Sequence, residues 1–240
     1  MKERDEMAGN QEFTPRSIQN DLDSYLDGIA GATGIFRAAV DNYLVAGPDG
    51  GCWQQAKQIA EHIRALDDLQ QKLEVGARAQ WIDGALVSDM ADPLTRVGRM
   101  LKEMKRQITG FAIESGFSSP GRRVPAHLLA DMQALAEEVC AAVYALIARY
   151  RPSLAWWGDD STEAPLSRGV EWYEKQADRR SMRLLKTIFA DDTMDVETKL
   201  PLAQLVEELD RVADHAVAID REVRCAGKVG VHAPGGRASR

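Results

Sequence analysis

Apolar side chains recur at alternating steps of three and four residues through most of this 240-residue chain. The clearest run is Leu94, Val97, Leu101, Met104, Ile108 and Phe111. This spacing places the apolar residues on one face of an α-helix, whereas no window alternates apolar and polar residues strongly enough for a strand. We therefore predict an all-α protein in which each narrow apolar stripe is buried by neighbouring helices.

Six such stripes follow one another, separated by segments rich in glycine, proline and serine or otherwise polar. The order long helix, loop, helix, turn, helix occurs twice, which predicts two tandem three-helix bundles. The strongest internal break is the segment 115–121, where six of seven residues are Gly, Pro or Ser. The predicted ranges are a disordered N-terminus at 1–15, a first three-helix repeat at 16–115, a linker at 116–125, a second three-helix repeat at 126–225 and a disordered tail at 226–240.

Helix ends are predicted from prolines and small polar residues. Asp92 and Pro93 are typical of an N-cap followed by a first-turn proline, so the third helix is expected to begin there. Pro201 is expected in the first turn of the sixth helix, because proline disrupts a helix interior. The fifth helix is expected from about Leu166 to Phe189.

Charge and cysteine content exclude several classes of protein. The net charge of -7 argues against a general nucleic-acid binder, because neutralising phosphates requires clustered Lys and Arg. Cys52, Cys140 and Cys225 lie far apart, which is expected of isolated thiols in a reducing cytoplasm. No apolar stretch is long enough to span a membrane, and the N-terminus lacks the apolar region of a signal peptide. We therefore expect a soluble cytoplasmic protein with no direct membrane insertion.

Two acidic groups stand at helical spacing in the second half of the chain. Glu174 and Asp178 are four residues apart in the fifth helix, and Glu207, Asp210 and Asp214 follow at steps of three and four in the sixth. Such spacing puts the carboxylates on one face of each helix, where like charges repel. A bound Mg²⁺, Mn²⁺ or iron ion would offset that repulsion.

The alternative interpretation is a solvated acidic face, because 37 acidic residues will produce such spacings by chance. Trp172 and Tyr173 flank the acidic group and are expected in the core. His215 is adjacent to Asp214, but a surface histidine is the favoured interpretation, since no Glu-x-x-His pattern of ferritin-like metal sites is present. No phosphate-binding loop or nucleophile motif occurs either.

Several segments resemble the PhoU-like family of phosphate-transport regulators, and in particular the branch of Pit-type transporter accessory proteins. They are SYLDGIAGATGIFRAAVDNYL, IAEHIRALDDLQQKLE, DPLTRVGRMLKEM, WYEKQADRRSMRLLKTIF and LPLAQLVEELDRVADHAVAIDREV. The resemblance covers residues 20 to 224 and is carried by the order, spacing and duplication of these segments. It implies two three-helix bundles side by side.

The resemblance also implies a repeated E/D-x-x-x-D metal signature on the second and third helices of each bundle. In repeat two the signature falls on four carboxylates, which are Glu174, Asp178, Asp210 and Asp214. In repeat one it falls on Ile63, Asp67, Lys105 and Thr109. A lysine in a carboxylate cluster repels a cation, so repeat one is expected to have lost its site. The implied cofactor is a divalent or iron ion whose identity is open.

The function implied by the resemblance is non-enzymatic regulation of inorganic phosphate transport through a membrane transporter. The protein would then be cytoplasmic and peripheral to the inner membrane through that partner. Two other interpretations of the acidic residues stay open, a metal-dependent hydrolase and a metal-free helical adaptor. Apolar helix faces left over after bundle formation would allow a homodimer.

Overall fold

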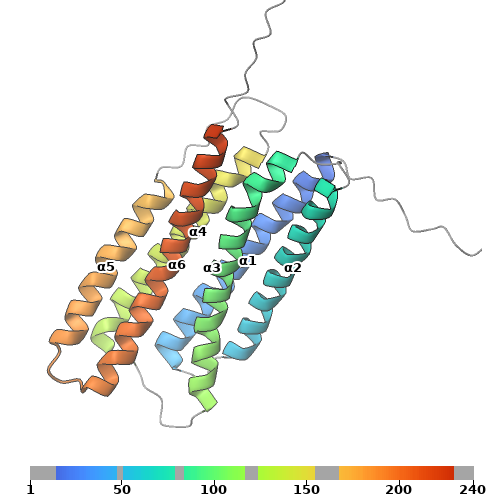
Figure 1. Cartoon of the computed structure of the whole chain (residues 1–240). Coiled ribbons are helices and arrows are strands. Elements are labelled where there is room, and N and C mark those ends of the chain that lie inside the picture. The colour runs from blue at the N-terminus through green and yellow to red at the C-terminus, as the bar shows by residue number, and fades with distance from the viewer. Residues whose placement is uncertain (1–14, 48–50, 79–83, 117–123, 155–167, 230–240) are drawn as a thin grey trace, which may run out of the picture.

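The computed structural model describes residues 15–47, 51–78, 84–116, 124–154 and 168–229 (Figure 1). Within these ranges every element is a helix and no strand occurs, which confirms the all-α prediction. The helices are α1 (Pro15–Ala46), α2 (Cys52–Arg78), α3 (Gly84–Gly116), α4 (Ala126–Leu154), α5 (Val170–Ala190) and α6 (Val196–Val229). The predicted disordered N-terminus, linker and tail fall mostly outside the described residues, although α6 continues through Val229 into the predicted tail.

The helices form two three-helix bundles that lie side by side, as predicted. Helices α1, α2 and α3 pack on one another, and so do α4, α5 and α6. The bundles meet where α1 packs against α4 and α3 packs against α6. Helices α2 and α5 therefore occupy the two outer edges of the molecule (Figure 1). None of the described helices is both long and apolar enough to cross a bilayer.

One continuous apolar core runs through both bundles. Its largest fully buried side chains include Phe36, Ile59, Met104, Ile108, Met132, Leu135 and Leu184. Met104 and Ile108 belong to the stripe from Leu94 to Phe111 that the three-four spacing predicts. The second half is held to the first by this shared core, so neither bundle buries its apolar face alone.

Ion pairs add to the contact between the bundles. The Arg37 guanidinium on α1 lies 3.1 Å from the Glu137 carboxylate on α4. On the other side of the interface, Arg106 on α3 lies 3.1 Å from Glu208 on α6. These arginines are partly or largely exposed, so the pairs fix the orientation of the bundles more than they contribute to stability.

Both predictions of a first-turn proline are wrong, because each helix begins earlier in the chain than predicted. Helix α3 begins at Gly84, so Asp92 and Pro93 lie inside it. Helix α6 begins at Val196, because the Asp195 carboxylate accepts a 2.8 Å hydrogen bond from the Thr198 amide and caps it. Pro201 is thereby in the second turn. Each helix continues through its proline, which removes one backbone hydrogen bond.

The edge helix α5 is fastened to α4 by Arg180. Its guanidinium donates two 2.8 Å hydrogen bonds to Glu138 and one of 2.9 Å to Asp131. We expect Arg180→Ala to lower the free energy of unfolding by about 1–2 kcal/mol, because a bidentate, partly buried pair is lost. Urea denaturation measures this. The matched control is Arg179→Ala, whose exposed side chain has no ion pair among the described residues; an equal loss in both variants would contradict the assignment.

Candidate metal site between α5 and α6

A short turn brings the two acidic groups into register. The turn at 191–195 is closed by Asp191, whose carboxylate accepts a 2.8 Å hydrogen bond from the Thr193 amide. Burial of Val170, Ala177, Ser181, Leu184 and Ile188 fixes the rotation of α5 about its axis. In this antiparallel hairpin Asp178 and Asp210 are both nearer the turn, and Glu174 and Asp214 are both farther from it. The structure therefore brings all four sequence-predicted residues to one stretch of the hairpin.

Asp210 is the most buried member of the group. Burial is the largest influence on its carboxyl and, with repulsion from Asp214, Asp178 and Glu174, raises its pKa to about 6. A hydrogen bond from the Ser181 hydroxyl, 3.1 Å from Asp210 Oδ2, opposes that rise. A proton and a cation can therefore compete for the Asp210 carboxyl near neutral pH.

The pKa of Glu174 is subject to the same influences. Burial raises the pKa of its carboxyl, and the charges of Asp214 and Asp178 raise it further. Arg221 and Lys175 act in the opposite direction. Glu207, the remaining acidic residue of the predicted α6 group, is exposed and does not contribute to either shift.

The four carboxylates are coupled electrostatically, but they are not already arranged as a cage. Among the described residues, no three His, Cys, Asp or Glu side chains converge closely enough to hold a metal ion together. The donor set is nevertheless what hard cations prefer, since it consists of carboxylate oxygens whose repulsion a cation would relieve. Asp178 and Asp214 are exposed, so their side chains are free to turn toward an ion.

His215 is half-buried beside this group. Burial lowers the pKa of its imidazole, while the charges of Glu103 and Asp214 raise it. The predicted surface position of His215 is therefore only partly right, because the side chain is half-buried.

The raised pKa of Asp210 predicts a pH-dependent stability. Its folded-state pKa lies above that of an unfolded aspartate, so the favourable contribution is complete below pH 4 and is lost as pH rises through 6. Asn imitates the protonated form and can still accept from Ser181. We expect Asp210→Asn to stabilise the metal-free protein at pH 7.5 by about 1–2 kcal/mol, a value reduced for partial exposure, and to change little at pH 4.

Thermal unfolding across that pH range, in a chelating buffer, measures the effect. Glu207→Gln on the exposed side of α6 is the control and should show no such pH dependence. A destabilised Asp210→Asn variant at pH 7.5 would contradict the assignment.

Repeat one presents different chemistry at the corresponding positions. Ile63 is buried in the core, whereas Asp67 is exposed. On α3, the Thr109 hydroxyl donates a 2.8 Å hydrogen bond to the Lys105 carbonyl and so is occupied by its own helix. These positions offer one carboxylate, one ammonium and no second carboxylate, and the loss of metal binding in repeat one stays a prediction.

The structure corrects the predicted burial of Trp172 and adds Ser181 to the candidate site. Trp172 is exposed rather than buried, and its ring stacks under the Arg168 guanidinium at 3.9 Å. Tyr173 packs partly buried against the core. Ser181 is the residue that sequence reasoning missed; its place on the buried stripe of α5, one turn after Asp178, was the available signal.

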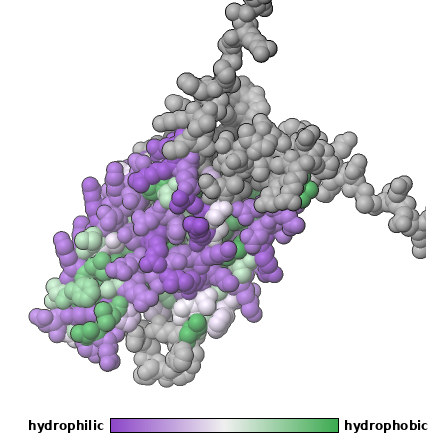
Figure 2. Space-filling model, in the orientation of Figure 1, coloured by the Kyte–Doolittle hydropathy of each residue, from purple (hydrophilic) through white to green (hydrophobic). Residues whose placement is uncertain are grey.

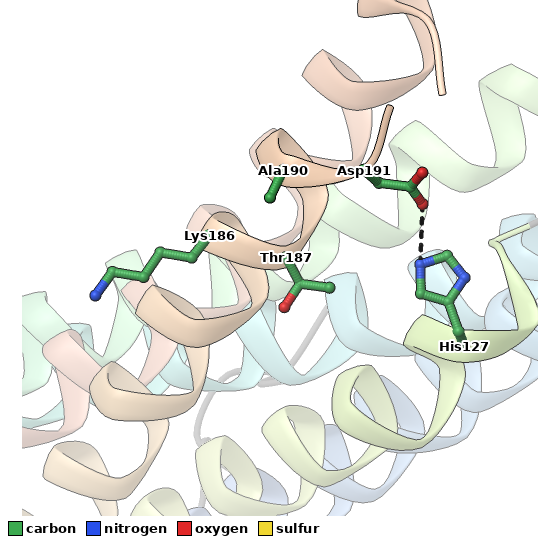
Figure 3. Close-up of a pocket in the computed structure, with 5 residues that line it drawn as sticks. All are labelled: His127, Lys186, Thr187, Ala190 and Asp191. Carbon is green, nitrogen blue, oxygen red and sulfur yellow. Dashed lines mark ion pairs between the residues drawn. The ribbon is translucent and has the colours of Figure 1, made fainter. Parts of the chain in front are cut away.

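Two hollows lie away from the acidic group. One, of about 510 Å³, is a shallow depression at the end of α5, where the imidazole of His127 points at the Asp191 carboxylate 3.2 Å away (Figure 3). The other, of about 490 Å³, lies between α1 and α2 and is lined by Tyr25, His62 and Lys72 among others. The Tyr25 hydroxyl is buried there with no hydrogen-bond partner among the described residues. Neither hollow contains the predicted metal residues.

The arrangement of helices has known counterparts. No protein-family model matches the sequence, and no curated protein matches it. A crystal structure from Shewanella oneidensis MR-1, described as a candidate PhoU-like phosphate regulatory protein, superposes with a TM-score of 0.69 over 90% of this chain and 100% of that one at 14% identity. A PhoU-like protein from the same strain superposes with a TM-score of 0.73, again at 14% identity, over 88% and 99% of the two chains.

The chain has the PhoU-like fold. Both similar structures are matched over nearly their whole length, so the likeness covers the PhoU-like double bundle rather than one half of it. At 14% identity the likeness establishes the fold and leaves the chemistry of the α5–α6 carboxylates to be argued from this chain's own residues.

Proposed function

We propose that this protein is a non-enzymatic accessory regulator of inorganic phosphate transport that binds a metal ion through α5 and α6. One observation carries the proposal, which is the register of four carboxylates on a PhoU-like hairpin with the pKa of Asp210 raised to about 6 by burial and mutual repulsion. Such a cluster costs stability in the free protein. Residues that cost stability are expected where function requires them.

The four side chains would act together on a cation. Glu174 and Asp178 from α5 and Asp210 and Asp214 from α6 would hold it. A bound ion would supply positive charge between carboxylates that otherwise repel one another. Ser181 orients Asp210 through its 3.1 Å hydrogen bond, and Arg221 limits the negative charge near Glu174. Occupancy by a proton or a cation would thus change the charge of the α5–α6 face.

The proposed partner is a Pit-type phosphate transporter in the inner membrane, approached from the cytoplasm. Cytoplasmic loops of membrane proteins carry an excess of Lys and Arg, and this chain has a net charge of -7. Complementary charge would favour encounter and fix orientation. The names of the two similar structures, which both refer to PhoU-like proteins, support a phosphate-related role.

Co-purification with a phosphate transporter from detergent-solubilised membranes tests the proposal. We expect the wild type to retain the transporter and Asp178→Asn/Asp214→Asn to retain less, with Glu207→Gln as the control. Failure of the wild type to retain the transporter would overturn the proposal. Turnover of a phosphate ester with Mn²⁺, abolished by Asp178→Ala, would instead support the metal-dependent hydrolase.

A further inference from the structure

The outer face of α5 carries a row of cations in an otherwise acidic protein. Lys175, Arg179, Arg183 and Lys186 follow one another at steps of four, four and three, so they line one face of the helix. The stripe of α5 that is buried against α4 and α6 lies on the opposite side. None of the four side chains has an ion pair among the described residues, and like charges at this spacing repel.

Large apolar side chains are exposed among these cations. Met182 is 51% exposed and Phe189 is 54% exposed on the same outer side of α5. Val196 and Leu200, at the beginning of α6, are also exposed. Figure 2 shows green surface gathered toward the lower left, over the end of the hairpin formed by α5 and α6. An apolar patch interleaved with cations differs from an ordinary solvated helix face.

The opposite edge of the molecule provides an internal comparison. Helix α2 holds the place in the first bundle that α5 holds in the second. Its acidic and basic residues are equal in number, with Lys57, Arg64, Lys72 and Arg78 against Glu61, Asp67, Asp68 and Glu74. An edge helix of this double bundle therefore does not need a row of cations.

We propose that the outer face of α5 is a docking surface for an anionic phospholipid membrane. Cations near such a surface are attracted to the lipid headgroups, and Met, Phe and Trp side chains enter the boundary between headgroups and acyl chains. The 21 residues of α5 span about 30 Å, which allows all four cations to reach one plane. The remainder of the chain is acidic and is repelled, so the protein would approach by this edge alone.

A fluid surface fits this face better than a folded protein would. The cations and apolar side chains project from an edge helix that packs on α4 and α6. Recognition of an acidic peptide would use a groove with matched pockets, whereas lipid headgroups adapt to a convex surface. The inference goes beyond the proposed function, since it requires neither metal nor transporter.

Flotation of the full-length protein with lipid vesicles tests the inference. We expect binding to vesicles of phosphatidylcholine with phosphatidylglycerol, none to phosphatidylcholine alone, and weakening by salt. Arg183→Glu/Lys186→Glu should weaken binding at least about tenfold. The matched control, Lys57→Glu/Arg64→Glu on α2, makes the same change in net charge and should leave binding unchanged. Circular dichroism of each variant verifies folding.

Two results would overturn the inference. One is an equal loss of vesicle binding in the α2 control and the α5 variant. The other is failure of the wild type to bind anionic vesicles; if the α5 variant then also converts a dimer to a monomer in sedimentation, a second copy covers this face. Because the vesicles contain no transporter, these outcomes leave the proposed regulatory function to its own test.

Discussion

Replacing Phe36 with Ala should lower the free energy of unfolding by about 3–5 kcal/mol, the cost typical of removing a fully buried aromatic side chain from a packed core. Phe36 lies on α1 with no exposed surface and belongs to the core that both bundles share. Alanine is a good helix former, so the loss comes from packing and not from helix propensity. Urea denaturation followed by circular dichroism gives the value.

The same experiment tests whether the bundles fold as one unit. Because the core is continuous, we expect a single transition that shifts as a whole. Val45→Ala on the same helix is the control; Val45 is 68% exposed, and its replacement should change the free energy by less than about 0.5 kcal/mol. Two transitions, of which only one shifts, would contradict a shared core.

Restoring the metal signature in repeat one should be costly without metal. In Ile63→Glu/Lys105→Asp, a carboxylate takes the place of a core residue that is 8% exposed. We expect the metal-free variant to lose about 2–4 kcal/mol of stability, since apolar burial is lost and a charge is partly buried. Lys105→Asp alone keeps Ile63 and should lose much less, which makes it the matched control.

Calorimetric titration of the double variant with Mn²⁺ then tests repeat one directly. The wild type is expected to bind only through repeat two, and the double variant to take up an additional ion and regain stability. An unchanged stoichiometry would show that repeat one lacks more than these two residues.

The helices themselves are predictable from the sequence, because burial imposes its period on the residues. The stripe through Val97, Leu101, Met104 and Ile108 is buried as its spacing predicts. Helix beginnings are less predictable, since Pro93 and Pro201 lie inside helices that start earlier. A proline limits only its own hydrogen bond, whereas the choice of start depends on caps such as Asp195, whose geometry depends on the preceding turn.

The placement of the four carboxylates on common helix faces is predictable from the sequence, whereas their environment is not. Helical spacing alone places Glu174 with Asp178 and Asp210 with Asp214 on common faces. The burial of Asp210 and its hydrogen bond to Ser181 depend on how α5 and α6 pack, which the spacing does not contain. The exposure of Trp172 could be predicted from the helical spacing, because this residue lies outside the buried stripe of α5. The shared core required knowledge of which helices of the two bundles meet.

The metal content of the untagged protein, measured by mass spectrometry with Asp178→Asn/Asp214→Asn in parallel, tests the central claim most directly. We predict metal in the wild type and none in the variant, because the variant loses one charged carboxylate from each helix of the hairpin. Both proteins should show the same helical content. Metal-free wild type after reconstitution, or equal metal in the two proteins, would contradict a metal site between α5 and α6.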